Sequence, residues 1–409
     1  MKNPLKAYDG LPREVYWLFT ARLVTSMGSF IMPLLTLILT QKLGLTAARA
    51  GWFITVLAAS QAPCLALGGR LADTIGRKKL LLVSYFGSAA AYLLCAFLGG
   101  HSMVACIVAA ADLAVLGMPA SDALLSDIVG PAQRKAAYSL LYFGMNMGIT
   151  VSMLLGGLLF QNFLPLLFFL DALTTICCGC IVACRVHERY RIPAAPDGPA
   201  MRAAQAEGKA AVPSLAAVLH AAPAVFFFVL LMFLYDFCYS QWTFLLPAQM
   251  GEQFGGAGAR LYSMLVVLNG ALIILCTPAV TLFSARIEPL WAMAVGGALY
   301  GGSYLVFAAG HSMPMYALAS ALLTFGEIVC TIQIGSFLAD RTPAACRGRV
   351  NAFSNFVRGA GSSSSPAVTG ELLPVLGYGG AWLLMAALMA AGTAGMALLH
   401  RLERKQRRV

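Results

Sequence analysis

The stretch Gly69-Arg70-Leu71-Ala72-Asp73-Thr74-Ile75-Gly76-Arg77-Lys78-Lys79 is a short, highly charged segment between two long apolar ones. Its glycines allow a sharp turn and a close approach of helices, and Asp73 can cap a helix or pair at a helix end. The run Arg77-Lys78-Lys79 favours the cytoplasmic face of a membrane, where basic residues concentrate. The pattern therefore predicts a tight cytoplasmic loop between two membrane helices.

Composition indicates a membrane protein independently of this loop. Of the 409 residues, 59% are hydrophobic and 11% are charged, and the mean hydropathy is +0.77. This leaves too little polar surface to cover a soluble globule. Apolar runs long enough to cross a bilayer as helices recur about twelve times. We expect membrane spans at 14–40, 47–68, 79–99, 102–126, 137–160, 164–184, 222–247, 261–283, 289–309, 313–338, 350–373 and 378–400.

The net charge of +11 follows from topology and does not indicate nucleic-acid binding. With the amino terminus inside, nearly all Lys and Arg residues fall in cytoplasmic segments, and the outside keeps only Lys42, Arg49 and Arg260. We therefore expect both termini in the cytoplasm. The first span lacks the short core and cleavage site of a signal peptide, so we expect it to be retained. The eleven cysteines lie in or at the ends of spans and are expected to be free thiols.

An internal repeat divides the chain into two halves. Gly100-His101-Ser102-Met103 recurs as Gly310-His311-Ser312-Met313, and the stretch from Asp127 to Arg134 is echoed by the stretch from Asp340 to Arg347. The offset is about 210 residues. We expect an all-α polytopic membrane protein of twelve transmembrane helices in two pseudo-symmetric six-helix bundles. Its parts are an N-terminal bundle at 1–184, a cytoplasmic connector at 185–221, a C-terminal bundle at 222–400 and a basic tail at 401–409.

The charged loop resembles the signature loop that joins helices 2 and 3 in the major facilitator superfamily of transporters. The resemblance implies that helices 1, 4, 7 and 10 line a central cavity, and that the loop acid pairs with a basic residue near the start of helix 5. The residues expected to form such a conformational gate are Gly69, Asp73, Gly76, Arg77 and Arg134. The alternative is that the basic run serves topology alone.

The fifth span contains a glycine-rich segment, 146–157, that is similar to the segment typical of exporters of this family. Ser152-Met153 stands where exporters usually have Gly-Pro. The repeat copy in the eleventh span keeps a proline, Pro366. We expect a helix 5/11 hinge at Gly148, Gly156, Gly157 and Pro366. Packing by small residues is the alternative.

Ionisable residues within spans each cost about 2.5–3.5 kcal/mol to insert and require an explanation. Candidates are Arg22, Asp112, Asp171, Asp236, Glu327 and Arg358. Glu327 is the first choice for proton coupling and Asp236 the second, with Arg22, Asp112 and Arg358 as further functional charges. Asp171 falls on a helix that the resemblance places at the periphery. The residues expected to line the substrate cavity are Tyr235, Tyr239, Gln241, Trp242, Asn269 and Gln333.

Structural ion pairs are the competing interpretation of these charges. Arg358 could neutralise Glu327, and Arg22 could neutralise Asp112 or Asp122. Arg22 with Asp112 is also a candidate charge-swapped version of the pairing that the family often makes with a helix-4 arginine, which this chain lacks.

No nucleophile, metal cluster or cofactor loop stands out in the sequence, so we expect a transporter and not an enzyme, with no cofactor and no metal. The cysteines at 177, 178 and 180 lack a nearby histidine and are expected to pack.

The chain resembles bacterial twelve-helix drug:proton antiporters. This implies proton-coupled export of amphipathic or cationic small molecules by alternating access. It also implies a multi-pass monomer in the bacterial inner (cytoplasmic) membrane. The partners are then a small molecule, protons and the lipid bilayer, without nucleic acid. The alternatives are a proton-coupled importer of a small metabolite, anionic or not, a transporter of a lipid-linked substrate, and a membrane scaffold.

Overall fold

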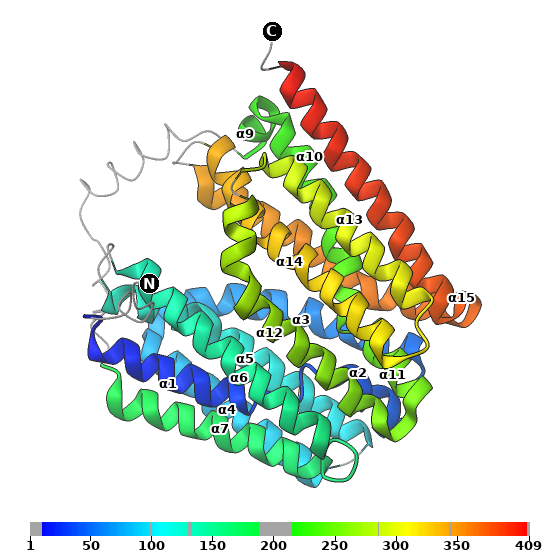
Figure 1. The fold of residues 1–409 in the computed structure, drawn as a ribbon. Helices are drawn as coiled ribbons and strands as arrows, with labels where there is room; N and C mark the ends of the chain where they lie inside the picture. Colours follow the sequence, from blue (N-terminus) through cyan, green and yellow to red (C-terminus); the bar gives the residue numbers. More distant parts are fainter. Residues whose placement is uncertain are drawn as a thin grey trace, which may run out of the picture. The chain divides into compact units, whose positions relative to one another are not determined.

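The computed structural model describes residues 10–98, 100–129, 133–187, 215–284, 286–342 and 346–406. The described residues are almost entirely helical (Figure 1). The helices are α1 (Arg13–Met27), α2 (Leu35–Leu37), the π-helix η2 (Ile38–Lys42), α3 (Ala47–Ile75), α4 (Arg77–Phe97), α5 (Gly100–Ile128), α6 (Arg134–Leu159), α7 (Leu164–Arg185), α9 (Leu215–Ala221), α10 (Pro223–Tyr239), the 3-10 helix η3 (Ser240–Trp242), α11 (Leu245–Phe254), the 3-10 helix η4 (Gly255–Ala257), α12 (Gly258–Ser284), α13 (Pro289–Ala308), α14 (Met313–Arg341) and α15 (Arg347–Gln406).

Within the described ranges, nine segments are long and apolar enough to cross a membrane. Two of them, 223–284 and 349–405, each hold more than one helix, because η3 and η4 interrupt the first and a kink at Gly377 divides the second. The expected first span is broken into shorter pieces. These features confirm the expected all-α membrane architecture. Most of the expected connector, 188–214, lies outside the described residues.

The predicted loop at 69–79 is much shorter than expected. Helix α3 runs through Ile75 and α4 begins at Arg77, so a single residue, Gly76, separates them. Gly76 has φ +98°, a conformation that side-chain-bearing residues rarely adopt. The charged residues therefore extend the two helices, and one glycine makes the turn.

The expected continuous span at 14–40 is wrong, because the first helix breaks after Met27. Gly28 lowers helix stability and Pro33 lacks the amide hydrogen that a helix needs. Backbone groups freed inside a membrane need other partners. Asp171 of α7 supplies one, since its buried carboxylate accepts a hydrogen bond from the Ile31 amide at 3.4 Å. Asp171 therefore has a structural contact that accounts for its place in a membrane helix.

The seventh span breaks at the equivalent point, between α10 and α11. A serine supports each break: Ser152 of α6 donates to the Ser29 carbonyl at 2.7 Å, and Ser365 of α15 donates to the Phe237 carbonyl at 2.6 Å. The two serines are 213 residues apart, which is close to the repeat offset. Ser152, which departs from the usual exporter sequence, thus makes a serine-to-carbonyl contact near a helix break, as its repeat counterpart does.

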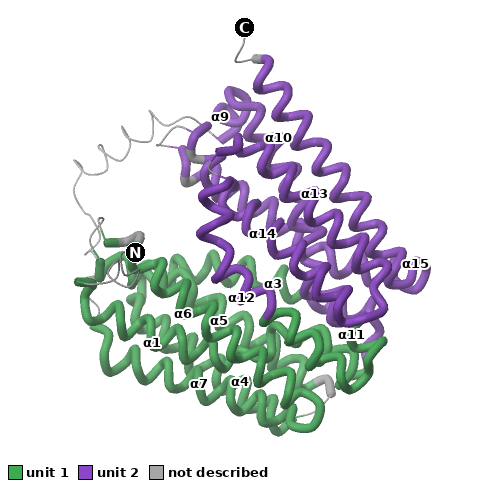
Figure 2. The backbone as a smooth tube through the Cα atoms, viewed as in Figure 1, with its two compact units in different colours: residues 1–44, 56–194, 250–267 green, residues 45–55, 195–249, 268–409 purple. Residues whose placement is uncertain are grey.

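The described chain forms two compact units (Figure 2). Unit 1 contains residues 1–44, 56–194 and 250–267, and unit 2 contains 45–55, 195–249 and 268–409. These units differ from the expected bundles at 1–184 and 222–400, which the connector at 185–221 separates. Within unit 1, Gln41 donates to the Gly251 carbonyl at 3.0 Å. Within unit 2, Thr55 donates to the Ser363 carbonyl at 2.7 Å. The division places the start of α3 in unit 2, and the end of α11 with the start of α12 in unit 1.

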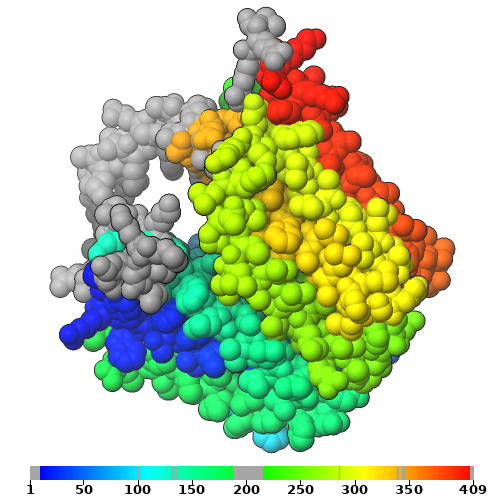
Figure 3. Space-filling view, viewed as in Figure 1, coloured from blue at the N-terminus to red at the C-terminus, as the bar shows by residue number. Residues whose placement is uncertain are grey.

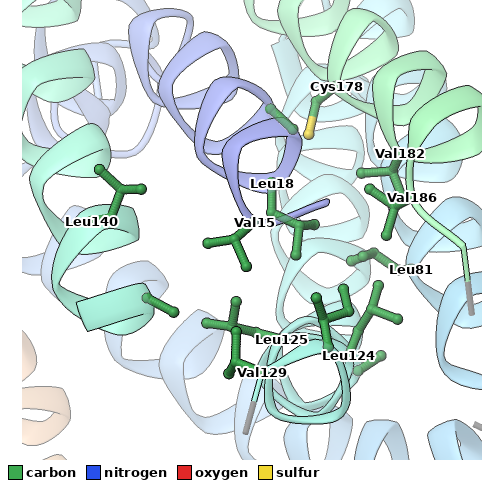
Figure 4. Packing of buried hydrophobic residues seen from close by; sticks show 14 of the residues in the cluster. Val15, Leu18, Leu81, Leu124, Leu125, Val129, Leu140, Cys178, Val182 and Val186 are labelled. Carbon is green, nitrogen blue, oxygen red and sulfur yellow. The ribbon is translucent and has the colours of Figure 1, made fainter. Parts of the chain in front are cut away.

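Unit 1 has a core of mainly aliphatic side chains from six long helices (Figure 4). Val15 and Leu18 of α1 face Leu124 and Leu125 of α5, with α3, α4, α6 and α7 completing the cluster. Because a lipid bilayer is as apolar as these side chains, close packing stabilises the unit more than burial does. Tight helix contacts are therefore the main structural requirement.

Unit 2 packs aromatic rings where unit 1 packs aliphatic chains. Trp382 of α15 stacks on Phe307 and Tyr304 of α13, with ring centroids 4.7 and 5.6 Å apart. Helices α13 and α15 lie side by side on the face shown in Figure 3. A groove of about 820 Å³ runs between them, and its lining includes Gly301, whose Cβ position is open.

Gly148 provides a test of this packing. A Cβ atom there would lie 2.5 Å from Ser26 Cβ and 2.8 Å from the Leu23 carbonyl oxygen, so α1 and α6 would have to separate. We expect Gly148→Ala to lower the free energy of unfolding by about 1–3 kcal/mol. Gly301→Ala is the control, since its Cβ meets nothing, and it should raise stability by up to about 1 kcal/mol. Thermal unfolding in detergent measures both, and equal effects would contradict the packing role.

Candidate functional site

An ion pair lies in the membrane-spanning part of unit 2. Arg358 of α15 donates from Nε to Asp236 Oδ2 at 2.8 Å and from a terminal nitrogen to Oδ1 at 3.1 Å. This bidentate geometry is the strongest form of the arginine–carboxylate contact. The partner of Arg358 is therefore Asp236, and the predicted pairing of Arg358 with Glu327 is wrong.

Glu327 of α14 is held by neutral donors instead. Asn269 of α12 donates from Nδ2 to Glu327 Oε2 at 2.9 Å and also to the Thr324 hydroxyl at 2.9 Å. Tyr239 is a further hydrogen-bond partner of this carboxyl group. No ion pair joins Glu327 to a cation in the described part of the chain. It is thus a carboxyl group in an apolar bundle without a fixed counter-charge.

These groups share one small cavity. Its volume is about 90 Å³, which is room for a few water molecules. The polar side chains that line it are Tyr235, Asp236, Tyr239, Tyr300, Glu327, Thr331 and Arg358. Pockets for drug-sized ligands occupy roughly 300–1,000 Å³. The cavity therefore suits water, a proton or a small ion.

Only part of the predicted substrate lining meets in this cavity. Tyr235 and Tyr239 line it, and Asn269 reaches it through its bond to Glu327. Gln241 is buried elsewhere and donates to Ser365 and Thr369 of α15. Two further predicted members are buried but do not line the cavity: Trp242 and Gln333.

Unit 1 carries its own charged groups. Asp112 of α5 accepts a hydrogen bond from Ser60 of α3 at 2.9 Å. Arg22 of α1 contacts the Met145 sulfur of α6 at 3.3 Å. In the described part of the chain no direct ion pair joins Arg22 to Asp112 or Asp122. The Arg22 charge still acts on the Asp122 carboxyl group at longer range, whereas Asp112 is bound by Ser60.

In each unit, an acidic side chain of a membrane helix accepts a hydrogen bond from the equivalent neighbouring helix. Ser60–Asp112 joins the second and fourth helices of the first half, and Asn269–Glu327 joins the second and fourth helices of the second half. Within unit 1 the acid meets a small hydroxyl, whereas within unit 2 it meets an amide that binds two groups at once. The repeat thus carries related polar pairs with different chemistry.

The charged residues at the α3–α4 turn form a cluster within unit 1. Arg77 pairs with Asp127 of α5, donates to the Ala123 carbonyl at 3.1 Å, and lies 3.9 Å from the exposed Asp73. Gly76 makes the turn, as described above. The Arg134 side chain, the expected partner of Asp73, lies outside the described residues. Our residue predictions omitted Asp127, although the repeat echo had marked its position.

The predicted hinge residues all lie in helices at close contacts. Within unit 1, Gly156 lies against Phe30 and Leu34, and Gly157 lies against Ser263. Within unit 2, the carbonyl of Pro366 lies against the Cβ position of Gly51. These positions pack helices closely, and a hinge role remains a prediction.

Comparison with known proteins places this architecture in a family. Residues 18–366 match the family model described as Major Facilitator Superfamily. The MFS-type transporter YqjV of Bacillus subtilis (strain 168) is 24% identical over 367 residues, which cover 88% of this chain and 85% of that protein. A Na(+), Li(+), K(+)/H(+) antiporter of Planococcus maritimus is 20% identical over 302 residues, covering 69% and 71% of the two chains.

Solved structures share the fold at low sequence identity. The POT family transporter PepTSo superposes with a TM-score of 0.79 at 14% identity, covering 97% of this chain and 99% of that one. The human organic anion transporter MFSD10 superposes with a TM-score of 0.64 at 16% identity, covering 97% and 100%. The family model spans most of the chain, and the fold agrees with it. This protein is a membrane transporter of the Major Facilitator Superfamily.

Proposed function

We propose that this protein is a proton-coupled antiporter that exports amphipathic small molecules across the bacterial cytoplasmic membrane. The observation that carries the proposal is Glu327, a carboxyl group bound by Asn269 and Tyr239 with no paired cation among the described residues. Ionisable groups within membrane helices commonly serve proton relays. Glu327 can accept a proton in one state of the cycle and release it in the other.

The neighbouring ion pair makes Glu327 the group that titrates. Arg358 neutralises Asp236, so the charge of the cavity changes only through Glu327. At about 90 Å³ the cavity has no room for an amphipathic compound. We therefore assign proton coupling to Glu327 and place substrate recognition elsewhere in the molecule.

Export is supported by two observations. The segment 146–157 is similar to the glycine-rich segment of exporters, and a relative covering 69% of the chain is named as a cation/proton antiporter. In the proposed cycle the bundles at 1–184 and 222–400 rock, with the Arg77–Asp127 cluster and Asp73 as the gate. Both termini are cytoplasmic in this topology, as the basic residues indicate.

Exchange of monovalent metal cations for protons is the second candidate function. The cavity is small and offers oxygen atoms from Glu327, Tyr239 and Thr331. Hard cations prefer oxygen ligands, and the Planococcus relative is named for Na(+), Li(+) and K(+). The size of the cavity favours this candidate, whereas the exporter-like segment favours the first.

Proton flux in proteoliposomes separates the candidates. The purified chain is reconstituted with a pH-sensitive dye and an acidic lumen, and solutes are added outside. Antiport of amphipathic compounds predicts lumenal alkalinisation on adding such compounds but not NaCl, LiCl or KCl. The second candidate predicts lumenal alkalinisation on adding NaCl, LiCl or KCl, but not on adding amphipathic compounds. Proton entry together with solute would indicate an importer, and absence of flux with all solutes would contradict both proposals.

A further inference from the structure

Unit 1 contains a second cavity, and two opposite charges that line it are not in direct contact. Its volume is about 200 Å³, and it lies among α1, α4, α5 and α6. Arg22 and Asp122 both line it and interact electrostatically, yet no direct ion pair joins them or links either to another described residue. Charges left apart in an apolar bundle are unfavourable unless something binds them. The cavity therefore presents one cationic and one anionic group to a ligand.

In the second half of the chain, the equivalent positions hold two opposite charges that do form an ion pair. An offset of 213–214 residues relates Arg22 to Asp236 and Met145 to Arg358. In unit 2 these positions hold an acid and an arginine in a bidentate pair. In unit 1 the arginine stands at the acid position and contacts the sulfur of a methionine at 3.3 Å. Met145 therefore gives Arg22 no charged partner, whereas the equivalent residues of unit 2, Asp236 and Arg358, neutralise each other.

We infer that the cavity of unit 1 binds a zwitterionic small molecule with an apolar body. A carboxylate of the ligand pairs with Arg22, whose planar guanidinium matches carboxylate geometry. An ammonium group of the ligand pairs with Asp122. The apolar body packs against Tyr142, Met118 and Leu141, which line the same cavity. That this ligand is the transported substrate rests on the proposed function, whereas its binding can be measured without transport.

Three probes with one apolar body test the charge pattern. Phenylalanine carries both charges, phenethylamine lacks the carboxylate, and 3-phenylpropionate lacks the ammonium group. Calorimetric titration of the full chain in detergent should give saturable binding of phenylalanine, with each single-charge probe weaker by about tenfold or more. Equal binding of phenylalanine and 3-phenylpropionate would overturn the assignment of Asp122. Absence of binding by all three would overturn the site.

Met145→Glu tests the site without removing a charge from it. Because Met145 already contacts Arg22, a glutamate there should supply an internal carboxylate like that of the Asp236–Arg358 pair. Phenylalanine binding should be lost, while Met145→Gln, of equal length and neutral, should keep it. Native-like binding by Met145→Glu would contradict the inference. Should that variant not fold, Asp122→Asn provides the second test, since it should abolish the preference for phenylalanine over 3-phenylpropionate.

These outcomes are independent of the transport assay. Binding with the predicted charge preference but without proton flux would leave the site intact and overturn the proposed antiport. The opposite result is proton flux with amphipathic compounds that lack the zwitterionic pattern, without binding of the probes. It would support the antiport and overturn the zwitterion site.

Discussion

Replacing Asp236 alone by asparagine is expected to lower the free energy of unfolding by about 3 kcal/mol. The change leaves the Arg358 guanidinium, which donates twice to this carboxylate, without a counter-charge. Losses of about 3–5 kcal/mol are typical when one partner of a buried ion pair is removed. The lower end applies because the Arg358 side chain keeps 31% exposure and the Asp236 side chain 19%, so solvent screens part of the remaining charge.

A double variant shows whether the loss of stability comes from the unpaired Arg358 charge or from other effects of the substitution. Replacing both partners by uncharged residues, as in Asp236→Asn with Arg358→Met, removes the stranded charge, and most of the lost stability should return. Glu327→Gln is the matched control, since it neutralises another carboxyl group of the same cavity that has no paired cation. It should change stability by less than about 1 kcal/mol. Thermal and denaturant unfolding in detergent give all three values, and a double variant as unstable as the single one would contradict the ion-pair explanation.

The helices of this fold could be predicted from sequence because long apolar runs leave the backbone few alternatives in a bilayer. The breaks in the first and seventh helices could not. Gly28 and Pro33 lie in an apolar run, and glycine and proline are common in intact membrane helices. What stabilises the first break is Asp171, 140 positions along the chain from the amide it binds. Such a contact leaves no local signal.

The charged members of the candidate site were predicted, but their pairings were not. Glu327, Asp236 and Arg358 do line one cavity, because intramembrane charges are rare enough to stand out. Their partners depend on the rotation of each helix, and successive residues differ by about 100° around a helix of 3.6 residues per turn. Span boundaries that are uncertain by a few residues therefore cannot decide whether Arg358 meets Glu327 or Asp236. The structure assigns it to Asp236.

Proton flux should be abolished altogether in Glu327→Gln, while exchange of solute across the membrane continues. Glutamine has the same shape as a protonated glutamate, and its side-chain carbonyl can still accept the hydrogen bond that Asn269 now donates to Glu327 at 2.9 Å. The amide cannot release and rebind a proton in the physiological range. The transporter should therefore behave as if permanently protonated, which uncouples solute movement from the proton gradient.

Two assays on the same liposomes distinguish this uncoupling from general damage. Counterflow of labelled solute, with equal pH on both sides, should stay near the native rate in Glu327→Gln, whereas solute-evoked pH change should fall to that of empty liposomes. Asp112→Asn is the control, because it neutralises the equivalent acid of unit 1, which a hydroxyl of Ser60 holds. Its proton flux should persist, since the proposal assigns the proton to Glu327 alone. Native flux in Glu327→Gln would exclude Glu327 as the proton carrier, and loss of flux in both variants would indicate that both halves carry protons.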